Sequence, residues 1–177
     1  MQKNMSPLPV RGKDAVEILL NDHTVLRDML TRLTQATQTQ QRQQVMEQLK
    51  GALTIHNATE ENLVYPALRE VAGKKAESQH LYQETAEADV LVFQLDTMLK
   101  EGNDTEFDTT ARKLQDAVLE HMDDEENKAF PQLQKGAEPQ QTQMLTDSVR
   151  EFRSAFQFTA HGGGAETGEI SQRSVRT

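Results

Sequence analysis

The sequence carries the same eleven-residue pattern twice, starting at His56 and at His121. Each copy reads His, three residues, Glu-Glu-Asn, two residues, an aromatic residue and Pro. Residues four apart on an α-helix lie on one face, so His56 projects together with Glu60, and His121 with Glu125. One His and Glu at this spacing is weak evidence in a chain with 28 acidic residues. Repetition of the whole pattern indicates a function, and imidazole beside carboxylate is typical of a site for a transition-metal ion.

Two further histidines extend the set of candidate ligands. Each copy of the pattern follows a predicted helix with one histidine on its apolar line, His23 in the first case and His80 in the second. Six side chains thus fall on stripes that otherwise hold Leu, Val and Ala, without Lys or Arg. Because burying an uncompensated carboxylate costs on the order of several kcal/mol, the two Glu need strong partners. A single histidine on such a stripe is more often a satisfied core residue, but the doubled pattern favours two metal ions bridged by the carboxylates. The predicted metal ligands are His23, His56, Glu60, His80, His121 and Glu125.

The donor set also restricts the identity of the metal. The chain has no Cys, which excludes thiolate ligands, disulfides and iron–sulfur clusters. Two His per ion, two shared carboxylates and an oxo or hydroxo bridge give about five ligands and leave one position open. Zinc prefers four ligands, so we expect two iron ions, with manganese as the second choice. No catalytic side chain beyond the ligands is evident.

Hydrophobic periodicity predicts the helices that must hold these ligands. Apolar residues recur at three- and four-residue steps in four long segments joined by short connections, and no strand signal is present. Asp14 is suited to cap the first helix, and Pro66 and Pro131 are expected to break or end the second and fourth. The prediction is an all-α, up-down-up-down four-helix bundle. Its organisation is a flexible N-terminus (1–13), the di-metal bundle (14–135), an additional C-terminal helix (136–160) and a disordered tail (161–177).

Composition narrows the class of protein. Hydrophobic residues are 36% of the 177-residue chain and aromatic residues only 5%, which suits an aliphatic core of packed helices. A formal net charge of −9 argues against nucleic acid and against an anionic membrane surface as partners. No stretch has the length of a transmembrane helix, and residues 1–13 lack the apolar run of a signal sequence. We therefore expect a cytoplasmic location.

At the doubled motif the chain resembles the hemerythrin-like, HHE cation-binding family. The resemblance covers roughly residues 14–133. It implies that His23 and His56 serve one iron, that His80 and His121 serve the other, and that Glu60 and Glu125 bridge them. This ligand set is most similar to that of the iron-centre repair and stress proteins of the family, although the chain lacks their Cys-containing N-terminal domain.

Two positions leave alternatives open. Respiratory hemerythrins have a further His one turn after the third-helix ligand, where this chain has Glu84. Glu84 could bind iron, hydrogen-bond a ligand His or face solvent. A carboxylate at the iron would stabilise the ferric state, which argues against reversible O2 carriage. Tyr65 and Phe130 are expected to pack at helix ends, although Tyr65 could reach toward the metals.

Two functions fit these features. The first is a redox-active di-iron protein that binds or reacts with O2, peroxide or nitric oxide in stress protection or sensing, supplied by an electron donor that the sequence does not identify. The alternative is a non-enzymatic module for iron binding, sensing or storage, whose fold depends on the metal.

Overall fold

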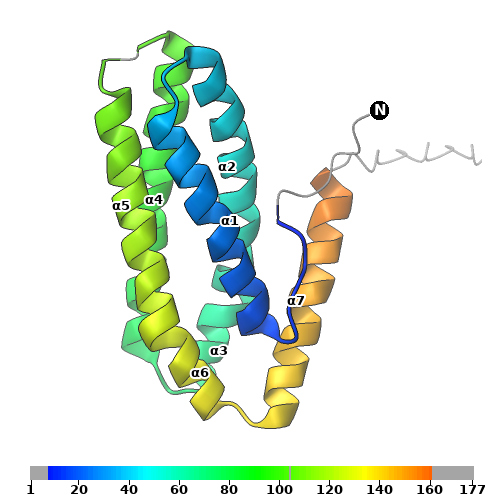
Figure 1. Ribbon diagram of the computed structural model, residues 1–177. Helices are drawn as coiled ribbons and strands as arrows, with labels where there is room; N and C mark the ends of the chain where they lie inside the picture. Colours follow the sequence, from blue (N-terminus) through cyan, green and yellow to red (C-terminus); the bar gives the residue numbers. More distant parts are fainter. Residues whose placement is uncertain (1–7, 104, 161–177) are drawn as a thin grey trace, which may run out of the picture.

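The computed structural model describes residues 8–103 and 105–160, and all the regular elements in this part of the chain are helices. Four long helices form an up-down-up-down bundle, and a fifth, α7 (Pro139–Ala160), packs beside α1 and α2 (Figure 1). The four are α1 (Ala15–Gln35), α2 (Thr39–Thr59), α4 (Lys75–Glu101) and α5 (Phe107–Asp124). The predicted all-α bundle with an additional C-terminal helix is therefore confirmed, whereas the predicted tail, 161–177, lies outside the described residues.

The ends of the long helices follow local sequence signals. Asp14 caps α1, where its Oδ1 accepts a hydrogen bond of 2.9 Å from the backbone N–H of Glu17. Gly102 ends α4 in the left-handed region with φ 67°, a conformation that glycine adopts without a Cβ clash. α2 begins at Thr39, so the Gln-rich stretch at its start is helical.

The motif prolines do not end their helices, contrary to the prediction. A π-helical turn precedes each one: η1 (Glu60–Val64) leads into α3 (Tyr65–Glu70), and η2 (Glu125–Ala129) leads into α6 (Phe130–Gly136). Each proline then lies in the first turn of the helix that follows. There a missing N–H removes no α-helical hydrogen bond, so the chain continues in helical form.

The core has two main apolar clusters along the bundle. The larger one fills the half that contains the α1–α2 connection, and the smaller one surrounds α3 and α6. The predicted ligands of α1 and α2, His23 and His56, lie in sequence between the two clusters. Leu8 is fully buried in the larger cluster, and the segment that follows it runs between α1 and α7 (Figure 1). No helix in the described part of the chain is both long and apolar enough to span a lipid bilayer.

Candidate metal centre

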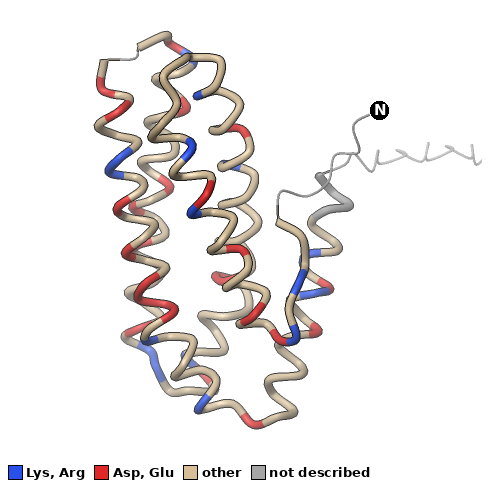
Figure 2. Tube along the Cα trace, viewed as in Figure 1, with Lys and Arg blue, Asp and Glu red and all other residues tan. Residues whose placement is uncertain are grey.

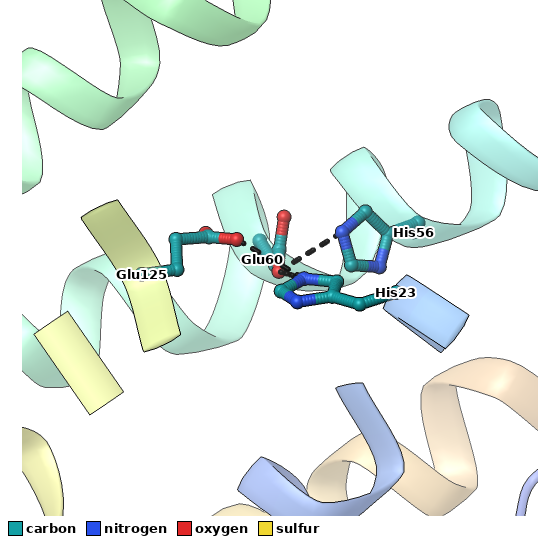
Figure 3. Close-up of side chains that lie close together, drawn as sticks. All are labelled: His23, His56, Glu60 and Glu125. Atoms are coloured by element: carbon teal, nitrogen blue, oxygen red, sulfur yellow. Dashed lines mark ion pairs between the residues drawn. The ribbon is translucent and has the colours of Figure 1, made fainter. Parts of the chain in front are cut away.

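Four of the six predicted ligands meet in the interior of the bundle. They are His23 from α1, His56 from α2, Glu60 at the start of η1 and Glu125 at the start of η2 (Figure 3). None is more than 2% exposed. The donor atoms of these four side chains lie within 4.8 Å of one another, so they could hold one cation together.

The facing atoms of this cluster have no hydrogen-bond partner among the described residues. They are His23 Nε2, His56 Nε2, Glu60 Oε1 and Glu125 Oε2. His56 Nε2 lies 3.2 Å from Glu60 Oε1, and His23 Nε2 lies 3.2 Å from Glu125 Oε2 and 3.9 Å from Glu60 Oε1. Neighbouring ligand atoms bonded at about 2.1 Å to one ion stand about 3.0–3.5 Å apart, so the two separations of 3.2 Å fit a coordination shell and the one of 3.9 Å is wider. Buried polar atoms without partners are rare, and a cation would satisfy all four.

Their surroundings shift the pKa values of the two carboxyl groups in opposite directions. Burial, and then repulsion from Glu125, raise the pKa of Glu60 well above its ordinary value. Burial also acts to raise the pKa of Glu125, but attraction to His121 and to His23 lowers it overall. Burial lowers the pKa of His56 to about 4. The metal-free site therefore holds a neutral His56 at neutral pH, which is the form that binds a metal ion.

His121 and Tyr65 lie near the other oxygens of the two glutamates. The Tyr65 hydroxyl lies 2.9 Å from Glu125 Oε1, 3.3 Å from Glu60 Oε2 and 3.1 Å from His121 Nε2. On an α-helix Tyr65 would point about 140° away from Glu60, five residues earlier. The π turn between them has the wider i→i+5 spacing and brings both side chains to the same place. The aromatic residue of the first motif therefore does reach the cluster, an alternative that the sequence left open.

Glu84 and His80 form the outer part of this region. Glu84 Oε2 lies 3.0 Å from His121 Nδ1, so of the three roles considered for Glu84 the structure shows a hydrogen bond to a predicted ligand His. His80 is 57% exposed, and its Nε2 lies 3.1 Å from Glu84 Oε1 and 3.6 Å from Asp124 Oδ2. The structure does not bring His80 to the buried donors, and groups it instead with Glu84 and Asp124. Acidic side chains outnumber basic ones on α4 and α5 (Figure 2), which favours the approach of cations.

Carboxylates also contact the outward-facing nitrogens of His23 and His56. Glu126 Oε1 lies 2.7 Å from His23 Nδ1 and accepts a hydrogen bond of 2.8 Å from Arg27. Asp22 Oδ2 lies 3.3 Å from His56 Nδ1. Such contacts fix the orientation of a ligand imidazole and leave Nε2 free for the metal. Glu126 directly follows Glu125 in the doubled motif, whereas the sequence gave no signal for Asp22.

Asp22 is in turn held by a side chain from α7. The guanidinium of Arg153 donates hydrogen bonds to Asp22 Oδ2 and, at 2.6 Å, to Thr59 Oγ1. Arg153 is fully buried, and His56 together with this guanidinium holds the pKa of Asp22 below its ordinary value, although burial acts to raise it. Sequence reasoning missed Arg153, because residues 131 positions apart in the chain show no shared pattern.

Comparison with known proteins supports the interpretation as a metal site. Residues 14–133 match the family described as "Hemerythrin HHE cation binding domain", which confirms the predicted resemblance. A protein of Nostoc sp. (strain PCC 7120 / SAG 25.82 / UTEX 2576) named "DNA nickase" is 28% identical over 152 residues. The similarity covers 86% of this chain but only 42% of that protein, so the chain spans less than half of its relative. No solved structure matches the chain significantly.

Proposed function

Because the chain belongs to the hemerythrin HHE cation-binding family, we propose that it binds iron at the buried cluster and that this iron reacts with O2, peroxide or nitric oxide. The observation that carries the proposal is the group of four buried donor atoms that face one another without hydrogen-bond partners. Two imidazoles and two carboxylates suit iron or manganese, and the absence of Cys removes the softer alternatives. Iron is the metal we propose, with manganese second.

The donors divide unequally between two ions. His23, His56, Glu60 and Glu125 supply a complete set for the first. For the second, the chain offers His121 and the oxygens of Glu60 and Glu125 that now contact the Tyr65 hydroxyl. His80 stands outside this set in the structure, so its part in holding the second ion stays a prediction.

The protein surroundings determine which molecules can reach bound iron. All four donors of the first ion are buried, and Phe130 stacks on His23 with ring centroids 5.8 Å apart. A ligand of two or three atoms can pass such packing through thermal motion, whereas a macromolecule cannot contact the centre. The Tyr65 hydroxyl, 2.9 Å from Glu125, is placed to donate a hydrogen bond beside the ligands. Bound iron would supply electron exchange with the small oxidant.

Strand cleavage of DNA, the activity in the name of the Nostoc relative, is not our proposal for this chain. Its formal net charge of −9 opposes binding to a phosphate backbone, and its predicted donors for the first ion are buried. The chain also matches only 42% of that relative.

The experiment is metal analysis of protein purified with and without air, followed by addition of peroxide and of nitric oxide. We expect about two irons per chain and near-ultraviolet absorption of a bridged ferric pair that changes with each reagent. A His23→Ala, His56→Ala double variant is the control and should lose the iron of the first position. Stable iron without any reaction would refute the redox proposal and favour the alternative, an iron-binding or iron-sensing module. Wild-type protein that takes up no metal would refute both.

A further inference from the structure

Arg153 is the one fully buried charged side chain that α7 contributes within the described residues. It lies beyond the family region, 14–133, and its helix packs outside the four-helix bundle (Figure 1). Taking a guanidinium out of water costs several kcal/mol in order of magnitude, so this position needs compensating partners. The partners of Arg153 are the residues that support the metal site.

A continuous line of polar contacts runs from α7 to the buried cluster. Arg153 donates to Asp22, and Asp22 Oδ2 lies 3.3 Å from His56 Nδ1. The other nitrogen of this ring, Nε2, is the unpartnered atom that faces Glu60 at 3.2 Å. Arg153 also donates to Thr59, which directly precedes Glu60. One side chain of α7 therefore acts on the surroundings of two predicted ligands.

Each contact in this line has a physical consequence for the ligand it touches. A carboxylate that accepts the Nδ1–H of an imidazole fixes its tautomer and its orientation toward a metal. That carboxylate is itself buried, so without Arg153 its charge would be uncompensated and Asp22 would have to move or take up a proton. The orientation of His56 thus depends on whether α7 is in place.

We propose that Arg153 is a positioning residue for the metal centre, and that docking of α7 and occupancy of the metal site stabilise each other. By thermodynamic linkage, the factor by which docked α7 raises metal affinity equals the factor by which bound metal raises the docking of α7. The inference rests on the proposed binding of metal, but it does not depend on which oxidant the iron meets. It makes α7 part of the metal site rather than an appendage to the bundle.

Arg150 supplies a matched control on the same helix. Its guanidinium donates to the backbone carbonyls of Gly12 and Lys13, at 3.2 Å each. It does not contact Asp22 or His56. Thr146 anchors the same helix by accepting a hydrogen bond of 3.1 Å from the Ala15 N–H. α7 therefore has anchors besides Arg153, so the loss of one of them leaves α7 docked and the support of His56 unchanged.

The first test uses the wild-type protein and needs no variant. Hydrogen–deuterium exchange of α7 is measured in metal-free protein and after anaerobic loading with Fe²⁺. We expect exchange in α7 to slow on loading, although no predicted ligand lies on this helix. Equal exchange in the two states, in protein shown to contain Fe²⁺, would overturn the inference and leave the proposed function standing. Wild-type protein that takes up no Fe²⁺ would overturn both.

The second test compares Fe²⁺ affinity in variants by competition with a colorimetric chelator. Arg153→Gln should weaken binding about 10–100-fold, the loss typical of an outer partner of a ligand His. Arg150→Gln should bind Fe²⁺ nearly as wild type does, and its α7 should still respond to metal. The double variant Asp22→Asn, Arg153→Gln removes both buried charges and so preserves folding if the single change does not. Wild-type affinity in the folded Arg153→Gln or double variant would overturn the inference.

Discussion

His56 should make the metal-free protein lose folding stability as the pH falls below 7. Its ring is buried, and burial lowers the folded-state pKa from 6.5 to about 4. In the unfolded chain the same imidazole takes up a proton near pH 6.5, whereas in the folded chain it stays neutral until about pH 4. Between these values protons bind the unfolded state preferentially. Acid therefore draws the protein toward the unfolded state.

The size of this contribution follows from the two pKa values. Linkage over the interval from pH 7 to pH 5 gives a loss of about 2 kcal/mol in the free energy of unfolding from His56 alone. His121 acts in the opposite direction. Burial acts to lower its pKa, but attraction to Glu125 and the hydrogen bond with Glu84 raise it overall. His121 thus contributes stability that is present below pH 6.5 and is lost as the pH rises through its folded-state pKa.

The assay is urea unfolding of chelator-treated protein at pH 7 and at pH 5, for wild type and for His56→Gln and His121→Gln. The difference in unfolding free energy, wild type minus His56→Gln, should fall by about 2 kcal/mol between pH 7 and pH 5. For His121→Gln the same difference should rise, which makes this variant a control of opposite sign. A difference for His56→Gln that is independent of pH would refute the reasoning, because it would mean that His56 is not a buried neutral ring.

Three further predictions concern single side chains. Glu60→Gln should change the folding stability of the metal-free protein by less than about 1 kcal/mol, because the raised pKa of Glu60 already favours the neutral form. The same variant should weaken Fe²⁺ binding by more than about 100-fold in chelator competition. His80→Ala should leave the affinity for the first Fe²⁺ nearly unchanged while His23→Ala abolishes it, and equal losses in the two variants would contradict the observed placement of His80. Gly12→Ala should lower the free energy of unfolding in urea by about 1–3 kcal/mol, because the φ of Gly12 is 142° and an added Cβ would stand 2.6 Å from the backbone N of Ile18. Gly73→Ala is the control: Gly73 has φ 68° and open space around it, so this change should lower the free energy of unfolding by only about 1 kcal/mol.

The long helices and most of the buried cluster could be predicted because their signals are local. The doubled pattern gives His56 with Glu60 and His121 with Glu125 through a spacing of four residues. Asp14 was identified as the cap of α1 from its type and its place before an amphipathic run. These features depend on neighbours within a few residues, and the periodicity of a helix makes such neighbours visible in the sequence.

His80 shows where helical periodicity gave too little information. The sequence predicted that His80 lies on the apolar line of its helix, but the buried positions in the first turns of α4 are Ser78, Leu81 and Thr85. Two of these are polar, and their hydroxyls are satisfied by carbonyls, Ser78 donating to Tyr65 O and Thr85 to Leu81 O. A stripe made partly of Ser and Thr does not stand out by hydrophobicity, so in the first turns of α4 the buried face lies about one residue away from the predicted line, whereas Ala88 and Leu95 are buried.

The support of the ligands could not be predicted for a different reason. Asp22 and Arg153 meet across 131 positions, and no periodicity connects them. A buried arginine looks like a solvent-exposed one in a sequence, because exposure is the ordinary state of this residue type. Only the packing of α7 against α1 and α2 reveals that the two charges are paired.

The π turns at Glu60–Val64 and Glu125–Ala129 have a consequence for how these segments tolerate insertions and deletions. A π turn is equivalent to an α-helix that has gained one residue, and it persists where the extra residue places a functional side chain. Deleting Leu63 would let the chain close into a regular α-helix in which the tyrosine follows Glu60 by four residues and so lies on the same face. The hydroxyl would stay beside the glutamates, whereas an α-helix of unchanged length would turn it about 140° away. A relative one residue shorter in this turn can therefore retain every histidine and glutamate of the doubled motif and also the hydroxyl beside them.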